Sequence, residues 1–170
     1  VRIINGGVLA PRNWDGTRYG SLALRVQGTV FVDECSTISA TGRGFRGGVT
    51  GVLTAAGQGE GQNQMGQFSY LSNDSGGGGG SKTGDCYRAS GAGGGHATVG
   101  ANGFQGCDLT TITRGGLAYG SARLDAMTFG GGGGGGSGRV DDRHGGNGGG
   151  GIKIRAASIA IDGTLEARGA

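Results

Sequence analysis

Apolar and polar residues alternate along two segments that lie near the two ends of the chain. In residues 20–42 the alternation begins with Leu22, Leu24 and Val26, each separated from the next by one polar or small residue. In residues 151–170 the sequence GIKIRAASIAIDGTLEARGA has the same period of two. This period is typical of β-strands, in which successive side chains point to opposite faces. We therefore predict strands at both ends.

The two segments also resemble each other in sequence. TISATG at Thr37–Gly42 matches TLEARG at Thr164–Gly169, and VFVD matches IAID after a shift of two residues. Short strands of three to five residues, joined by one or two small residues, are typical of the rungs of a parallel β-solenoid. An antiparallel sandwich is the alternative, but it would prefer tight Asn-Gly or Asp-Gly hairpins. We predict an all-β, solenoid-like fold with almost no helix.

Glycine runs divide the centre of the chain, from about residue 43 to 150, into short mixed segments. Long structureless loops are rare inside compact domains. Polyglycine can instead form an extended polyproline-II-type helix, whose bare surface allows several such helices to pack and exchange backbone hydrogen bonds. We expect residues 1–170 to form a single glycine-rich domain that includes these packed segments. The glycines predicted to pack in this way in the longest run are Gly130, Gly131, Gly132, Gly133, Gly134, Gly135 and Gly136.

The composition excludes two familiar glycine-rich classes. The chain has 46 glycines among 170 residues but a single proline, which excludes collagen. Charged residues make up 16% and the net charge is +3, a balance that does not fit a disordered polymer. The chain begins at Val1 and contains no run of signal-peptide or membrane-span length, so we expect a mature product or an excerpt without a membrane span.

The order of the motifs resembles a known group of proteins. ISATGRGFRGG, SGAGGGHATVG, AYGSARLDAMTFGGGGGGGSG and the closing GIKIRAASIAIDGTLEARGA are similar to glycine-rich repeat regions of large secreted or surface-attached proteins of environmental bacteria, often described as adhesin-like or PE-PGRS-like. The resemblance covers nearly the whole chain. It implies an extracellular or cell-surface location and a structural or adhesive role. A weaker likeness, based on the glycine runs alone, is to phage tail-fibre tip adhesins built on packed polyglycine helices.

Three cysteines are present, and the chain has no CxxC pair of the kind used in zinc sites. Cys86 and Cys107 flank a glycine-rich excursion, where a disulfide would restrict the unfolded chain by about 3 kcal/mol. We predict a bridge between them, which implies an oxidising compartment. The fate of the third cysteine, Cys35, stays open.

Only one cluster offers metal ligands. Asp141, Asp142 and His144 stand together in RVDDRHGGN and could hold a weak Ca²⁺ ion. We favour a solvated polar bend there, and we expect no cofactor.

Signals for enzymatic activity or nucleic-acid binding are weak. Asp33 and Glu34 are adjacent in a strand segment, so they point to opposite faces and do not form a converging acid pair. Arginines lie among glycines, but interspersed acids argue against an RNA-binding polymer. We therefore expect neither catalysis nor nucleic-acid binding.

Aromatic residues are the remaining candidates for contact with a partner. Phe68 and Tyr70 lie in the polar segment QNQMGQFSYLSN and could meet a glycan or a neighbouring subunit. We predict a non-enzymatic extracellular structural protein that assembles with copies of itself into a filament, matrix or adhesin. A receptor-binding or glycan-binding adhesin tip of the phage tail-fibre type is the alternative, and a carbohydrate-active enzyme is a third candidate.

Overall fold

A computed structural model describes residues 1–52, 56–63, 65–80, 89–104, 112–121, 123, 126–138 and 143–170. The described residues contain strands and extended segments and no helix, and most of the paired strands are parallel. The strand-rich, helix-free character predicted from the sequence is confirmed for this part of the chain. The strands are β1 (Arg2–Ile3), β2 (Val8–Leu9), β3 (Ser21–Val32), β4 (Thr37–Ser39), β5 (Gly51–Val52), β6 (Gly103–Phe104), β7 (Ile112–Thr113), β8 (Ser137–Gly138), β9 (Gly151–Ile161) and β10 (Thr164–Glu166).

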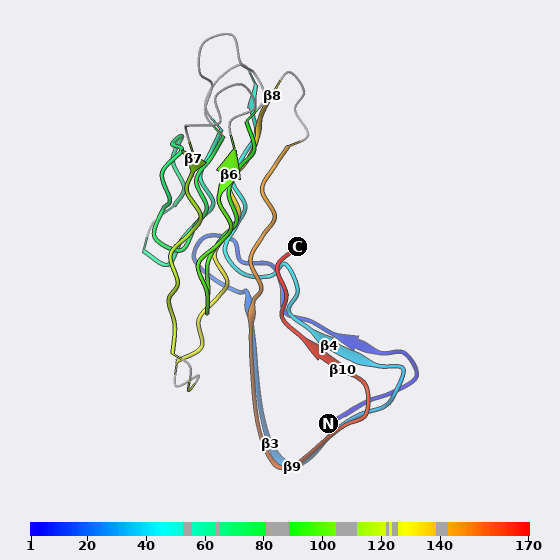
Figure 1. Cartoon of the computed structure of the whole chain (residues 1–170). Helices are drawn as coiled ribbons and strands as arrows, with labels where there is room; N and C mark the ends of the chain where they lie inside the picture. Colours follow the sequence, from blue (N-terminus) through cyan, green and yellow to red (C-terminus); the bar gives the residue numbers. More distant parts are fainter. Residues whose placement is uncertain are drawn as a thin grey trace.

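Two three-stranded parallel sheets stand at one end of the molecule, with the orders β1-β3-β9 and β2-β4-β10. Each strand of the first sheet continues through a corner into one strand of the second, so the chain makes three stacked, angled layers (Figure 1). The two matching sequence segments are neighbours in this stack. Thr37 pairs with Thr164 and Val30 with Ile159, which is the register of the sequence alignment.

The first layer of this stack lies outside the two matching segments, residues 20–42 and 151–170. Residues 2–9 align in register with the other two layers, so that Ile3, Val32 and Ile161 form one row across the sheet. The spacing from Ile3 to Leu9 equals that from Val32 to Ile38. This equal spacing is the sequence feature that could have indicated a third layer. The corner of this layer uses Asn5 and Gly6 with left-handed backbone (φ 59° and 73°), a conformation that asparagine and glycine tolerate best.

The two long strands correct the prediction of strands three to five residues long. β3 has 12 residues and β9 has 11. The pairing shifts between Val26 and Thr29, where two residues of β3 lie opposite one residue of β9. A bulge of this kind bends a strand without ending it, so the alternation continues through Gly28 instead of stopping at a corner.

A small apolar core lies inside the angle of the stack. Ile3, Val32 and Ile38 form its buried centre. Partly buried apolar residues from all three layers pack against them, namely Leu9, Leu22, Ile152, Ile154 and Ile161. This core explains the period of two, because the residues between these positions face outward.

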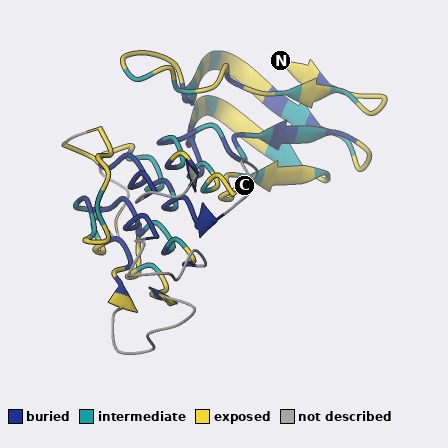
Figure 2. Ribbon diagram, turned by 90° about the horizontal axis from the view of Figure 1, so that it is seen from above, coloured by how far each residue is buried: buried dark blue, intermediate teal, exposed yellow. Residues whose placement is uncertain are grey.

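The glycine-rich centre forms the other half of the molecule. Between β4 and β9 the chain leaves the stack and runs back and forth in extended segments that lie side by side (Figures 1 and 2). Two strand pairs lie within this half: β5 pairs with β8 in parallel, and β6 pairs with β7 in antiparallel orientation. Figure 2 shows that many of its inner segments are buried although they carry few side chains. No helix in the described part of the chain is long and apolar enough to span a membrane.

Candidate functional site

The longest glycine run, Gly130–Gly136, is held by its amide groups on three sides. All seven N–H groups donate to backbone carbonyls, at 2.7 to 3.0 Å. The partner changes with a period of three along the run. Every third amide therefore reaches the same neighbouring segment, and the three segments reached are 143–149, 92–95 and 57–60.

The carbonyl groups of the same run reach two further segments. Those of Gly130, Gly133 and Gly136 accept from residues of segment 45–51, again every third residue. Those of Gly132 and Gly135 accept from Gly77 and Gly80 at 2.9 and 2.8 Å. The run is thus surrounded by five extended segments and is an integral part of the fold. A flexible linker would not satisfy its backbone in this way.

Side chains are excluded from most of this run by the closeness of the neighbouring backbones. A Cβ atom on Gly131, Gly132, Gly134 or Gly135 would overlap a carbonyl oxygen of an adjacent segment. Gly133 differs, because its nearest neighbour would be the Ala92 carbonyl oxygen at 3.6 Å, an ordinary contact. The requirement for glycine is therefore steric, and it varies from one residue to the next.

An aromatic cluster joins the glycine-rich half to the strand stack. Trp14, Phe45 and Phe129 meet edge to face, with ring centroids 5.4 to 5.9 Å apart. The indole N–H of Trp14 donates to the buried carboxylate of Glu60 at 3.0 Å, and Arg46 pairs with the same carboxylate at 3.2 Å. The three aromatic residues are far apart in the sequence, so periodicity gave no sign of the cluster.

The strand stack exposes apolar residues along the edge formed by β9 and β10. Ile159 and Leu165 are 49% and 48% exposed. Their register partners one layer inward, Val30 and Ile38, are fully buried. No described strand pairs with the outer side of β9 or β10. The apolar rows that are buried at Val30 and Ile38 therefore continue to this edge and are left uncovered there.

The opposite edge of the stack also exposes apolar side chains. Val1, Ile4 and Val8 are 52%, 41% and 69% exposed. Both ends of the stack thus present backbone and apolar surface that a further layer could cover.

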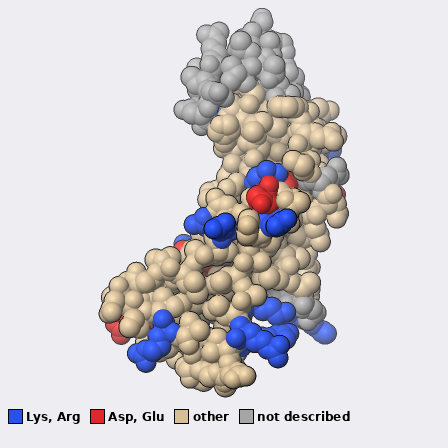
Figure 3. All heavy atoms as spheres, turned by 180° about the vertical axis from the view of Figure 1, so that it is seen from behind, with Lys and Arg blue, Asp and Glu red and all other residues tan. Residues whose placement is uncertain are grey.

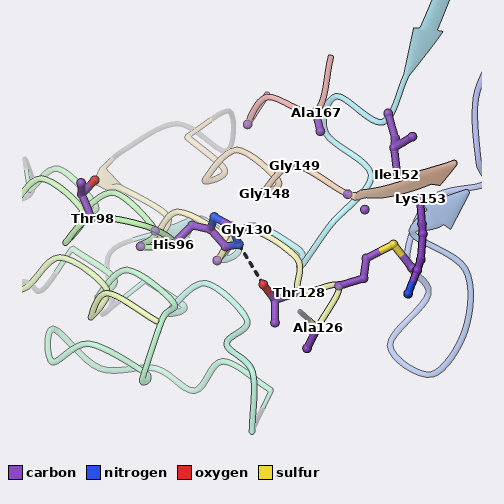
Figure 4. A pocket seen from close by; sticks show the side chains of 17 residues that line it. His96, Thr98, Ala126, Thr128, Gly130, Gly148, Gly149, Ile152, Lys153 and Ala167 are labelled. Atoms are coloured by element: carbon purple, nitrogen blue, oxygen red, sulfur yellow. Dashed lines mark hydrogen bonds between the residues drawn. The ribbon is translucent and has the colours of Figure 1, made fainter. Parts of the chain in front are cut away.

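A cavity of about 460 Å³ lies where the glycine segments meet the start of β9 (Figure 4). Its wall is largely glycine backbone, with His96, Thr98, Thr128 and Lys153 as polar side chains. His96 Nε2 lies 3.0 Å from the Thr128 hydroxyl oxygen, and the His96 ring meets the edge of Tyr119. Burial raises the pKa of Tyr119 to about 12, an effect that the Ser75 hydroxyl opposes. No carboxylate stands among the described residues of the wall.

The structure separates Phe68 and Tyr70, the two residues expected to contact a partner. Phe68 is 66% exposed and lines a hollow of about 260 Å³ together with Val49 and Met65. Tyr70 lines a different groove of about 600 Å³. The other large apolar residues of that groove, each at least 44% exposed, are Leu71, Val99, Ile112 and Leu117.

The predicted metal ligands and the predicted disulfide fall largely outside the described residues. The residues outside the described part of the chain are Asp141, Asp142, Cys86 and Cys107. His144 is described, and its Nδ1 accepts the backbone N–H of Thr50 at 3.2 Å. Among the residues that the structure describes, no group of three potential ligands is close enough to hold a metal ion. Cys35 is exposed at a corner of the stack and free.

Asp33 joins the corners of the first two layers of the stack. Its carboxylate accepts the backbone N–H of Asn5 at 2.8 Å. The Ser36 hydroxyl and this N–H group hold the pKa of Asp33 below its ordinary value, because both stabilise the charged form. Glu34 is exposed beside it. Asp33 thus has a structural partner within the corner.

Charge is unevenly distributed over the molecule. The net charge is +3, and the ion pairs between described residues are Arg46 with Glu60 and Arg168 with Glu166. Figure 3 shows Lys and Arg atoms gathered on the lower part of one face, around β3 and β9.

Comparison with known proteins gives no relative: no family model matches the chain, and neither a curated protein nor a solved structure shows significant similarity to it. The function must therefore be argued from the geometry.

Proposed function

We propose that this chain is a non-enzymatic, extracellular or cell-surface structural module that assembles with copies of itself into a filament, matrix or adhesin. In this proposal the angled layers are solenoid-like rungs, and the glycine segments are packed polyglycine II helices. The observation that carries the proposal is the open edge at β9 and β10, where Ile159 and Leu165 continue buried rows yet remain half exposed.

Assembly would join the β9–β10 edge of one copy to the β1–β2 edge of the next. All pairings within the stack are parallel, and a further layer in the same sense would place Ile3 beside Ile161 and Leu9 beside Leu165. Such a contact uses two different surfaces, so it does not close on itself as a symmetric dimer does, and it can propagate into a fibre.

The hydrogen bonds of Gly130–Gly136 support the polyglycine II part of the proposal. A helix with three residues per turn presents successive amides in three directions, 120° apart. Donation to three separate segments with a period of three is what such a helix requires. A pleated strand would alternate between two directions instead.

The resemblance to glycine-rich repeat regions of secreted and surface-attached bacterial proteins supports the location.

The test is the state of association as a function of concentration. We expect the wild-type chain to form oligomers or fibres in small-angle scattering and electron microscopy. The double variant Ile159→Lys, Leu165→Lys places two charges at the exposed ends of the apolar rows on the β9–β10 edge. We expect this variant to stay monomeric. Val99→Lys changes a more exposed apolar residue, 61% exposed, in the glycine-rich half and should assemble like the wild type. A wild-type chain that remains a monodisperse monomer at high concentration would refute assembly.

A receptor-binding or glycan-binding adhesin tip is the second candidate. The groove lined by Tyr70, Leu71 and Val99 favours it, because clustered exposed apolar residues commonly mark a binding surface. In this case Tyr70→Ala should abolish binding on a glycan array. Phe68→Ala should leave it unchanged, since Phe68 lines a separate hollow.

A further inference from the structure

The outward face of β3 and β9 carries three stacked cations. The apolar residues near the start of both strands, Leu22, Ile152 and Ile154, turn toward the core, so the residues between them face solvent. Arg25 lies directly opposite Arg155 on the neighbouring strand, and Lys153 stands two residues before Arg155. All three side chains are exposed.

Nothing in the described structure neutralises these cations. Neither β3 nor β9 contains an acidic residue, and neither ion pair between described residues involves them. Figure 3 shows Lys and Arg atoms gathered on the lower part of one face, with no Asp or Glu atom drawn among them. Like charges placed directly opposite each other on adjacent strands destabilise a sheet. An anion bound on this face would relieve that repulsion.

We propose that the outward face of β3 and β9 binds a linear anionic polysaccharide, through its carboxylate or sulfate groups. The guanidinium groups of Arg25 and Arg155 suit this task, because arginine can bind such anions with two parallel hydrogen bonds. Strands lie about 4.8 Å apart, and alternate residues along a strand lie about 6.6 Å apart. The three cations therefore form a short row along which a polymer can place successive anionic groups.

The other residues of this face favour a sugar polymer over a nucleic acid. Base binding generally uses exposed aromatic rings as stacking platforms. The aromatic residue on this face, Phe31, is covered by the guanidinium group of Arg2, which lies 4.8 Å from its ring centroid. Gln27 and Thr29 offer instead an amide and a hydroxyl for hydrogen bonds to sugar hydroxyls.

The same residues argue against a lipid surface. Insertion into a membrane interface requires large apolar side chains beside the cations. Within the two strands, the residues beside the three cations on this face are small or polar, as Ala23 and Gln27 illustrate.

This proposal does not depend on self-assembly, because the outward face and the strand edges are different surfaces. In an assembled fibre the cation row would recur in every copy, and binding would gain from multivalency. A monomeric chain should still bind, so failure of assembly and failure of polysaccharide binding can be told apart.

The experiment compares binding to immobilised alginate, heparin and neutral dextran, at protein concentrations where scattering shows the chain to be monomeric. We expect alginate and heparin to bind with an affinity that falls as salt rises, and dextran to give no signal. Combining Arg25→Gln, Lys153→Gln and Arg155→Gln should weaken binding at least ~10-fold, because three charged contacts are lost. Circular dichroism and the melting temperature report whether this variant is folded, and the loss of repulsion should leave its melting temperature equal or higher.

A matched variant controls for net charge. Combining Arg12→Gln, Arg18→Gln and Arg143→Gln removes the same charge from exposed arginines outside β3 and β9 and outside the Tyr70 groove, and it should bind like the wild type. If both triple variants lose binding equally, binding depends on net charge alone and the proposal is overturned. If the variant of Arg25, Lys153 and Arg155 binds like the wild type, the proposal is also overturned. Tighter binding to a single-stranded oligonucleotide or to phosphatidylglycerol vesicles than to either polysaccharide would show that the partner class is wrong.

Discussion

Gly134 is a residue at which the glycine packing can be tested most directly. A Cβ atom there would overlap the carbonyl oxygen of Gly78, and both groups belong to hydrogen-bonded backbone that cannot move independently. We expect Gly134→Ala to lower the free energy of unfolding by about 3 kcal/mol, the upper range for overpacking a close-packed interior. Urea denaturation followed by circular dichroism measures the change.

Gly133 provides the control within the same run. Its Cβ would meet its nearest neighbour at 3.6 Å, so Gly133→Ala introduces no overlap. Alanine reduces the freedom of the unfolded chain, and we expect this variant to be unchanged or up to about 1 kcal/mol more stable. Similar losses in both variants would mean that glycine is needed at these positions for backbone conformation rather than for space.

Asp33 gives the stack a dependence on pH. The Ser36 hydroxyl and the Asn5 backbone N–H lower the pKa of Asp33 in the folded chain, so the folded state favours the ionised carboxylate. The stability it contributes is present above the ordinary pKa of 3.8 and is lost as the pH falls through the lower folded value. Asp33→Asn should therefore be less stable than the wild type at neutral pH, and the difference should shrink as the pH falls below 3.8. Urea midpoints measured across this range test the prediction, and a difference independent of pH would contradict it.

At the scale of elements, the sequence predicted what depends on local pattern. The period of two from Leu22 onward was enough to predict strands in the terminal segments, because side-chain direction follows directly from strand geometry. The match between Thr37–Gly42 and Thr164–Gly169 indicated a repeat, and the structure pairs these two segments in parallel. The predicted strand length was wrong, because a bulge near Gly28 bends β3 without ending it, where a corner between two short strands was expected. Glycine segments have no side-chain pattern, so the sequence could not predict which segments neighbour one another.

The aromatic cluster of Trp14, Phe45 and Phe129 also could not be predicted, because no local sequence pattern connects its residues. Phe129 contacts both Trp14 and Phe45, and it precedes the glycine run directly. We expect Phe129→Ala to cost about 2 kcal/mol, less than for a fully buried ring because Phe129 is only partly buried. Thermal unfolding measures it. Phe104→Ala removes a ring that is 59% exposed and should change stability by no more than about 0.5 kcal/mol.

At the scale of the whole molecule, the strand stack closes only after the glycine-rich half has returned the chain to it. Leu22 pairs with Ile152, and the whole glycine-rich centre lies between them. A flexible excursion of that length would impose a loop-closure cost on the β3–β9 pair, whereas a folded centre brings the two strands together in advance. The halves also share the Trp14 cluster and backbone bonds such as that from Ala170 to Asn147 at 2.9 Å. We therefore expect the two halves to unfold as one cooperative unit.

Hydrogen exchange followed by mass spectrometry tests this coupling. In the wild type, peptides from β3 and from Gly130–Gly136 should exchange with the same free energy of opening. Gly134→Ala lies in the glycine-rich half, yet it should reduce protection in β3 and β9 by the same factor as in its own segment, while Gly133→Ala should leave both unchanged. If β3 and β9 keep their protection when the glycine run loses it, the stack is stable alone and the glycine-rich half does not hold it together. In that outcome, assembly through the strand edges would survive disruption of the glycine packing.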